Sequence, residues 1–262
     1  MPASRSSQTR QVRILVTGAS GELGGALARH YARAGATLLL WGRDQGRLAA
    51  VADDCRRAGA QAHIRSLDLT DGAAAIAAVV AEDAAGPIDL ALFASGLGDI
   101  RAADALVEDA AQVLRLGLVN FVVPSAMAAT LADRMARRGG GGIVLVGSAA
   151  AYHDLPFATA YAASKAGLSR FAQALRIGVA AHGVRVTLVS PGFIDTAAGR
   201  KVAGPKPFMM KPSDVARQIA RVAARGRPHL VLPWPFALIR LTDRLLPRRL
   251  RDRLLLALTP KR

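Results

Sequence analysis

The sequence has a single cysteine, Cys55, among 262 residues, so no internal disulfide can form. We interpret Cys55 as a bystander in a reducing compartment, since nothing beside it suggests activation. Although 52% of the residues are hydrophobic, no run approaches the roughly 20 uncharged apolar residues of a membrane-spanning helix. Residues 1–11 lack the apolar core of a secretory signal and predict a disordered basic tail. We therefore expect a cytoplasmic protein.

Acidic and aromatic residues are also scarce. There are 19 Asp and Glu against 35 Lys and Arg, which gives a net charge of +16. Such a charge suits nucleic acid, an acidic membrane surface or a phosphorylated ligand, and the many arginines and alanines indicate a compositional bias for part of it. Aromatic residues make up only 5% and do not alternate with basic ones, which disfavours stacking on single strands. We expect neither a nucleic-acid partner nor a metal ion.

The first pattern that is present is a strand, a glycine-rich turn and a helix. Residues 12–17 are apolar and β-branched, residues 18–25 contain four glycines, and residues 26–34 have helical spacing. Glycines let the backbone approach a phosphate closely, and the helix N-terminus that follows favours an anion. This order therefore predicts a dinucleotide-binding turn.

Strands and helices then alternate along the chain. Further strands are predicted at 36–41, 61–67, 88–94, 143–147, 184–190 and 229–232. Helices are predicted at 44–58, 71–85, 103–138 with an interruption near Pro124, 159–182 and 213–225. This alternation predicts an α/β fold, a single Rossmann-like doubly wound parallel sheet of about seven strands with helices on both faces. We assign residues 12–232 to one dinucleotide-binding catalytic domain.

A tyrosine, a lysine and a serine form the candidate chemistry. Tyr161 and Lys165 are four residues apart, so they share one face of the helix predicted there, and Ser148 stands 13 residues before the tyrosine. A free phenol titrates near pKa ~10, and a nearby positive charge lowers that pKa toward the working range. Alone, the pattern also suits any tyrosine and lysine on one helix.

Six motifs in order now make a specific resemblance. They are Thr17-Gly18-Ala19-Ser20 with Gly24, Asp68-Leu69, Asn120, Ser148, Tyr161 with Lys165, and Pro191-Gly192-Phe193-Ile194-Asp195-Thr196. With these motifs the chain resembles the short-chain dehydrogenase/reductase family, NADP-preferring type, from residue 12 to about 232. The resemblance implies an NAD(P)-dependent enzyme acting on CH–OH or C=O groups of a small-molecule substrate.

The resemblance also implies roles for the catalytic residues. Tyr161 would exchange a proton with the carbonyl or alcohol oxygen, and Lys165 would lower the pKa of Tyr161 and bind the nicotinamide ribose. Ser148 would donate a hydrogen bond to the substrate oxygen, and Asn120 would hold a water that links Lys165 to solvent. The alternatives are a strand-end hydroxyl for Ser148 and a helix-kink residue that satisfies local backbone groups for Asn120.

The expected cofactor contacts follow the same motifs. They are Gly18, Ser20, Gly21, Leu23, Gly24, Arg43, Asp68, Leu69, Ala94, Gly96, Tyr161, Lys165, Pro191, Gly192, Ile194 and Thr196. Where an NAD enzyme usually places a carboxylate, this chain has Gly42 followed by Arg43, which suits a 2′-phosphate. We therefore predict NADP(H) rather than NAD(H). The alternative is that Arg43 only caps an exposed turn.

Two positions depart from the family pattern. Glu22 replaces the usual middle glycine of the first turn, and its carboxylate would repel a pyrophosphate unless the side chain points outward. Residues 93–96 read Phe-Ala-Ser-Gly in place of Asn-Asn-Ala-Gly, so side-chain contacts that stabilise the central strands are missing. Neither departure touches the proton-transfer residues.

Substrate contacts are expected from the loops at 97–105, 149–157 and 197–211, the last acting as a lid. Their apolar residues favour an apolar pocket, with His153 as a polar contact or a solvated loop residue. If the C-terminal segment binds a membrane, a lipid-like or acyl-chain ketone is the expected substrate. The apolar residues are Leu155, Phe157, Phe208, Met209 and Met210.

The C-terminal segment, 233–262, predicts two short amphipathic helices, with Pro247 in the first turn of the second. Its leucines lie opposite arginines, which is typical of a helix peripheral to a membrane, here its inner face, or of a helix packed on the subunit or a neighbour. The leucines are Leu238, Leu241, Leu245, Leu250, Leu254 and Leu258. A homodimer or homotetramer is expected through the helices that carry Asn120 and Tyr161.

Two functions remain open. The first is an NADPH-dependent carbonyl reductase, or the reverse alcohol dehydrogenase. The second is a non-catalytic NADP-binding regulatory or scaffold protein. The intact set of Asn120, Ser148, Tyr161 and Lys165 favours catalysis.

Overall fold

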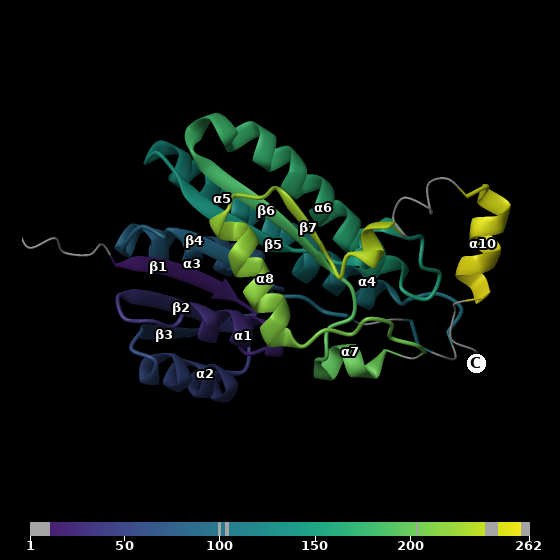
Figure 1. Ribbon diagram of the computed structural model, residues 1–262, viewed down its shortest axis with the longest axis horizontal. Helices are drawn as coiled ribbons and strands as arrows, with labels where there is room; N and C mark the ends of the chain where they lie inside the picture. The colour runs from purple at the N-terminus through teal and green to yellow at the C-terminus, as the bar shows by residue number, and fades with distance from the viewer. Residues whose placement is uncertain (1–10, 99–100, 103–104, 203, 239–245, 258–262) are drawn as a thin grey trace, which may run out of the picture.

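The sheet sets the architecture. The computed structural model describes residues 11–98, 101–102, 105–202, 204–238 and 246–257. They form a 7-stranded parallel sheet in the order β3-β2-β1-β4-β5-β6-β7 (Figure 1). The strands are β1 (Val12–Thr17), β2 (Ala36–Gly42), β3 (Gln61–Ser66), β4 (Leu90–Phe93), β5 (Gly141–Val146), β6 (Val184–Pro191) and β7 (His229–Leu232). The order reverses between β1 and β4, and the Rossmann-like prediction is confirmed.

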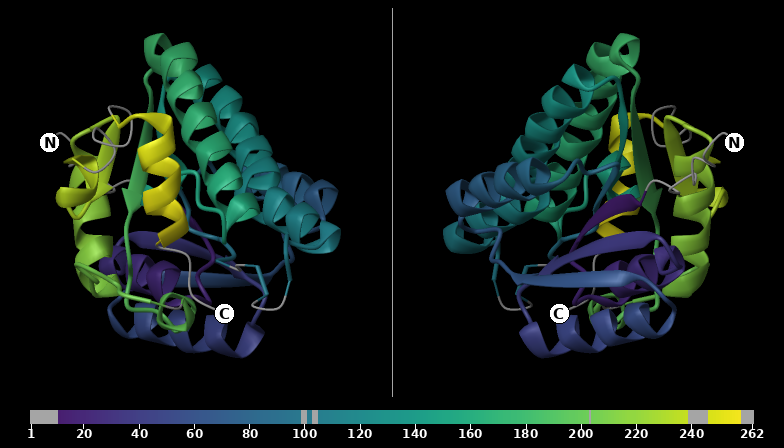
Figure 2. Two further views of the ribbon diagram at one scale, coloured as in Figure 1. Left: turned by 90° about the vertical axis from the view of Figure 1, so that its right-hand side faces the viewer. Right: turned by 90° about the vertical axis from the view of Figure 1, so that its left-hand side faces the viewer.

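Helices cover both faces of the sheet (Figure 2). One face carries α1 (Glu22–Tyr31), α2 (Gln45–Arg57) and α8 (Pro212–Ala224), and the other carries α3 (Gly72–Ala85), α5 (Val123–Arg137) and α6 (Thr159–Val179). Alternate residues of β1 therefore enter different cores: Ile14 and Val16 pack with the first layer and Leu15 with the second. Burial on both faces explains why residues 14–16 of this strand are all apolar.

Aspartates begin three of the helices. Asp44, Asp71 and Asp109 each accept a hydrogen bond from a backbone N–H three residues later, at 2.9 Å. The first helix needs a correction, because we expected it at 26–34 and it begins at Glu22. The glycine-rich turn is itself the first turn of the helix, with Gly25 N donating to Gly21 O at 2.8 Å.

The helix expected at 103–138 is shorter and interrupted earlier than predicted. It begins as α4 (Ala110–Gly117), passes through a π-helical turn, η1 (Leu118–Val122), and continues as α5. The break is therefore the π-turn around Asn120, just before Pro124. The segment Ala110–Arg137 is long and apolar enough to cross a membrane by length and composition. In this structure α5 packs into the hydrophobic core on the face of the sheet that also carries α3 and α6.

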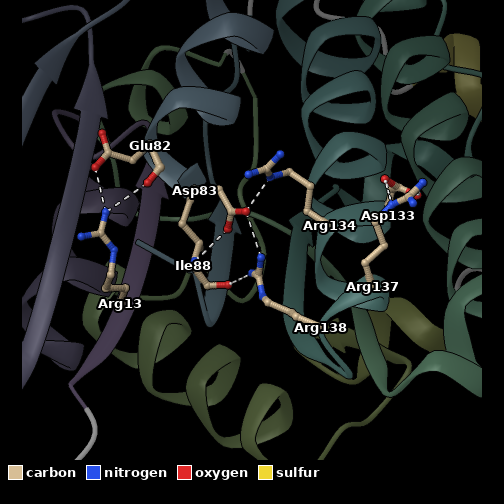
Figure 3. A network of polar contacts seen from close by, with 8 residues as sticks. All are labelled: Arg13, Glu82, Asp83, Ile88, Asp133, Arg134, Arg137 and Arg138. Carbon is tan, nitrogen blue, oxygen red and sulfur yellow. Dashed lines mark hydrogen bonds and ion pairs between the residues drawn. The ribbon is translucent and has the colours of Figure 1, made fainter. Parts of the chain in front are cut away.

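A buried carboxylate joins α3, the approach to β4 and α5 (Figure 3). Asp83 accepts hydrogen bonds from Ile88 N at 2.9 Å, Arg134 Nε at 2.6 Å and Arg138 at 2.9 Å. Burial raises the pKa of Asp83, but these hydrogen bonds outweigh it and hold the pKa below its usual value. Since removing one partner of a buried pair leaves the other charge uncompensated, this contact fixes how α5 sits on the sheet.

The last described helix lies beyond the sheet's carboxyl edge. After β7, residues 235–238 form a helical turn, and α10 (Arg248–Ala257) starts directly after Pro247 (Figure 1). Phe236 packs on Gly192, where an added Cβ would lie 2.6 Å from its ring. The tail at 1–10 and the segments 239–245 and 258–262 lie outside the described residues. The boundaries at 11–12 and 232–233 stay predictions.

Candidate active site

Two glycines of the glycine-rich turn, Gly18 and Gly24, have no room for a side chain. Gly18 has φ +71°, and a Cβ there would lie 2.8 Å from the Ser95 backbone. A Cβ on Gly24 would lie 2.1 Å from Gly18 O. The turn therefore packs tightly on the loop after β4, and α1 begins directly behind it at Glu22. This cradle fits the diphosphate of a dinucleotide.

The loop after β4 is held without the asparagines of the family pattern. Thr17 Oγ1 accepts a hydrogen bond from Ser95 N at 3.4 Å, so a β1 hydroxyl takes over part of that role. Ala94 and Gly96 flank Ser95. A Cβ on Gly96 would lie 3.3 Å from both Asn120 Oδ1 and Lys165 Nζ, so this loop lies directly against two of the predicted catalytic residues.

The end of β2 packs against Ser20 of the glycine-rich turn. A Cβ at Gly42 would approach the Ser20 hydroxyl to 2.5 Å, so a side chain there would have to displace that hydroxyl. Arg43 follows on the surface and, among the described residues, forms no ion pair. Beyond β3, Asp68 accepts a hydrogen bond from Thr70 N, which with the nearby Arg43 lowers the carboxyl pKa. Leu69 is buried.

The loop after β6 leads into a short helix, α7 (Ala197–Lys201), within the segment predicted to act as a lid. Gly192 N donates to Leu232 O at 2.6 Å, which ties the Pro191-Gly192 turn to the end of β7. Ile194 forms an isolated bridge with Met210, closing the base of the lid. Thr196 Oγ1 accepts from Gly199 N at 3.0 Å and caps α7.

Tyr161 and Ser148 face each other across the ends of α6 and β5. Burial raises the pKa of the Tyr161 phenol, and a hydrogen bond with the Ser148 hydroxyl lowers it in part. The net direction is upward, whereas the sequence pattern led us to expect a pKa lowered by Lys165. A phenol with a raised pKa is protonated at neutral pH, as a proton donor must be.

Lys165 lies deeper, with 4% of its surface exposed. Its Nζ donates to Val146 O, the last carbonyl of β5, at 3.0 Å. Burial lowers the pKa of Lys165 from 10.5 to about 8. Lys165 is thus protonated at pH 7, but it loses its proton at a lower pH than a surface lysine does.

Asn120 sits in the π-turn with its amide fully engaged. Its Oδ1 accepts from Leu97 N at 2.8 Å, and its Nδ2 donates to Leu97 O at 2.9 Å and to Ser164 Oγ at 3.2 Å. Asn120 therefore satisfies local backbone groups at a helix distortion. The water-holding role of Asn120 stays a prediction.

Sequence reasoning missed the cap of the catalytic helix. Residue Ala158 at the N-cap of α6 offers no side-chain acceptor. Instead Glu108, which is 9% exposed, accepts from Ala160 N at 2.7 Å and from the Thr159 hydroxyl. The alanine before a long helix was the available signal that an acceptor must come from elsewhere in the chain.

Sequence reasoning also missed a set of hydrogen bonds that supports the segment starting at Ser148. Ser148 starts a 3₁₀ turn, η2 (Ala149–Tyr152), and the Tyr152 hydroxyl lies 2.8 Å from Ser190 Oγ and 2.9 Å from His229 Nε2. Ser190 and His229 are 3.1 Å apart, so the three side chains tie η2 to β6 and β7. Contacts between strands so distant in sequence have no local signature.

The predicted substrate loops are only partly brought together. His153 and Leu155 line a cavity of about 290 Å³ with Pro156 and alanines of α6. Phe208 and Met209 are exposed on the lid segment. Among the described residues, no group of three or more His, Cys, Asp and Glu could hold a metal ion.

The sheet order, the glycine cradle and the Ser148–Tyr161–Lys165 cluster define a dinucleotide-dependent oxidoreductase of the Rossmann type. The chain belongs to the short chain dehydrogenase family, whose pattern it matches over residues 12–206. The family resemblance seen in the sequence is thereby confirmed.

Three similar proteins illustrate the relationship. An uncharacterized oxidoreductase of Myxococcus xanthus (strain DK1622) is 34% identical over 242 residues, covering 91% of this chain and 94% of that protein. Estradiol 17-beta-dehydrogenase 11 of Rattus norvegicus is 26% identical, covering 96% and 85%. The structure of a short-chain dehydrogenase from Sphingobium yanoikuyae in complex with NADPH is 25% identical with a TM-score of 0.78, covering 90% and 97%.

Burial of the Lys165 ammonium predicts that this residue lowers the stability of the protein at neutral pH. Below pH 8, Lys165 is charged in the folded and unfolded states, and its burial costs about 3 kcal/mol, from a pKa lowered from 10.5 to about 8. Lys165→Met should therefore raise the free energy of unfolding at pH 7 by about 2 kcal/mol, after loss of the bond to Val146 O. This gain should fade between pH 8 and 10.5, where the folded wild-type lysine is neutral.

Urea unfolding at pH 7, 8, 9 and 10 measures the effect. Lys211→Met, which removes an exposed lysine, is the control and should change little at any pH. A destabilised Lys165→Met protein at pH 7 would contradict the burial penalty.

Proposed function

We propose that the protein is an NADPH-dependent carbonyl reductase that also runs as a secondary alcohol dehydrogenase, with Tyr161 as the acid–base group. The observation that carries this proposal is the Tyr161 phenol, hydrogen-bonded to Ser148 and kept protonated by burial. It comes from the same helix face as Lys165, at the carboxyl end of β5. A non-catalytic scaffold would have no need to bury a lysine at this cost.

The residues divide the work on a substrate oxygen. The nicotinamide, when bound, supplies or accepts the hydride. Tyr161 donates its proton to the oxygen on which negative charge develops, and Ser148 donates a hydrogen bond to the same oxygen. The Lys165 ammonium stabilises the phenolate that remains, because an opposite charge nearby favours the ionised form. Asn120 holds Leu97 and Ser164 in place beside them.

NADPH is the favoured cofactor. The Ser20 hydroxyl fills the space at Gly42, and Arg43 presents an exposed guanidinium that forms no ion pair among the described residues. Guanidinium groups bind phosphate as a planar fork, so this corner suits a 2′-phosphate. The similar Sphingobium yanoikuyae structure is a complex with NADPH, which supports the same choice.

An apolar ketone is the favoured substrate class. Phe193, Phe208 and Phe236 form a cluster with ring centroids 6.4 Å apart in each of two edge-on pairs, next to Gly192. This aromatic wall stands beside the loop expected to cover the nicotinamide. A similar protein is named an estradiol dehydrogenase, which is compatible with a large apolar substrate.

Assembly into a homodimer or homotetramer is supported by apolar side chains left on the outer helices. Leu114 of α4 is 68% exposed, and Val113 and Val122 beside it are exposed too.

On α10, Leu250 and Leu254 are exposed next to the arginines Arg249 and Arg253, as expected of a helix that lies on an anionic membrane.

Replacing Tyr161 tests the reaction. Tyr161→Phe should lower kcat for ketone reduction by about 10²- to 10⁴-fold because the proton donor is lost, while NADPH binding is kept. The assay is NADPH oxidation with methyl ketones of increasing chain length. Tyr31→Phe, which alters a tyrosine on α1, should behave as wild type. No turnover with any ketone, despite tight NADPH binding, would favour the regulatory alternative.

Replacing Arg43 tests the cofactor choice. Arg43→Ala should weaken NADPH binding about 10- to 100-fold and leave NADH binding nearly unchanged, since only the 2′-phosphate loses a partner. Fluorescence titration with both cofactors measures this. The control is Arg47→Ala, an exposed neighbour paired with Asp44 at 3.3 Å. Tighter binding of NADH than of NADPH by the wild type would remove the claim.

Replacing the α10 leucines tests membrane contact. Changing Leu250 and Leu254 to serine should reduce co-sedimentation with anionic vesicles, because the helix then has less apolar surface to insert. Binding that is equal for both proteins would leave α10 as a helix packed on the subunit or a neighbour. The Arg251–Asp154 ion pair at 3.0 Å already holds α10 to the loop after η2.

A further inference from the structure

Glu22 is the first residue of α1, beside the phosphate cradle, and its carboxylate contacts the segment predicted to act as the lid. Its Oε2 accepts a hydrogen bond from Ala197 N at 2.6 Å, and its Oε1 accepts one from Arg200 at 3.2 Å. Both partners belong to α7, about 175 residues further along the chain. The first residue of the helix that would bind the diphosphate thus contacts the first turn of the lid helix.

Arg200 links this contact to the loop that precedes α7. It also donates to Asp195 at 2.7 Å, so one guanidinium joins two carboxylates. Hydrogen bonds from Arg200 to Asp195 and Glu22 raise the pKa of the guanidinium further, so its charge is permanent. The Glu22 carboxylate is therefore compensated as long as α7 stays in place.

Within the described part of the chain, the side chains of α7 itself add little to these contacts and to the Ile194–Met210 bridge before it. Helix α7 has five residues, and none of them is buried. Exposed ion pairs are individually weak, but the short hydrogen bond to Ala197 N is charge-assisted and the Arg200 contacts form a network. With no buried side chain on α7 to compete with them, these polar contacts determine where the lid helix sits.

We propose that Glu22 is a positioning residue that couples lid opening to cofactor release; this rests on the proposed dinucleotide site. When the lid is closed, Arg200 neutralises Glu22 beside the cradle. When the lid opens, Arg200 leaves and exposes a carboxylate next to the diphosphate, which repels it. One side chain therefore both fastens the lid and, once released, promotes dissociation. The glutamate in place of glycine becomes part of the cofactor cycle.

A double-mutant cycle tests the coupling. Arg200→Ala should raise the NADPH dissociation rate about tenfold, because it frees the lid and leaves Glu22 uncompensated. Glu22→Ala should raise it less, since the repelling charge is gone as well. In the Glu22→Ala background, Arg200→Ala should have almost no further effect. Stopped-flow displacement of NADPH, followed by its fluorescence, gives all four rates.

Two other results would overturn the proposal. Additive effects of the two substitutions would show that Glu22 and Arg200 act separately. Slower NADPH dissociation from Glu22→Ala, with no effect of Arg200→Ala, would make Glu22 a simple repelling charge. Arg217→Ala is the matched control, since it removes an equally exposed arginine paired with Asp214 at 2.9 Å. It should leave the rate unchanged.

Limited trypsin digestion separates this proposal from the proposed function. In the free protein, Glu22→Ala should speed cleavage after Lys201 several-fold, because the lid is no longer fastened, while Tm stays near the wild-type value. This readout needs no cofactor. Failure of the wild type to bind NADPH would overturn the proposed function alone. An unchanged cleavage rate would overturn the fastening of the lid even if NADPH binds.

Discussion

The reversal of strand order between β1 and β4 is the constraint on which the site depends. It brings the turn after β1 against the loop after β4 so closely that a Cβ on Gly18 would lie 2.8 Å from the Ser95 backbone. The same loop packs through Gly96 on Asn120 and Lys165. Phosphate cradle and catalytic helix are therefore positioned by one short segment, and neither can shift without the other.

The catalytic cluster is arranged around charges that the fold accepts at a cost. Lys165 is buried with one described hydrogen bond, and Glu108 is buried at the start of the same helix. A negative charge is favourable at a helix N-terminus, so Glu108 both caps α6 and complements its dipole. The structural carboxylate Asp83 is treated differently, with three donors that hold its pKa low. Lys165, at the predicted catalytic site, is thus less well compensated than Asp83.

The sequence predicted what periodicity and short motifs encode. The strand at Val12–Thr17, the aspartate-capped helices and the spacing from Ser148 to Lys165 are local patterns, and they were found. The direction of the Glu22 side chain, the π-turn at Asn120 and the cap from Glu108 depend on partners 23 to 175 residues away. The upward shift of the Tyr161 pKa depends on burial, which spacing alone does not reveal.

The packing of Phe236 on Gly192 also bears on truncation of the chain. The ring that covers the loop after β6 comes from beyond β7, outside the 7-stranded sheet. Proteolytic removal of the residues after Leu232 would leave all seven strands and the glycine-rich turn present but would take away one wall of the loop expected to cover the nicotinamide. The segment after β7 is thus part of the predicted active site and not an appendage to the sheet.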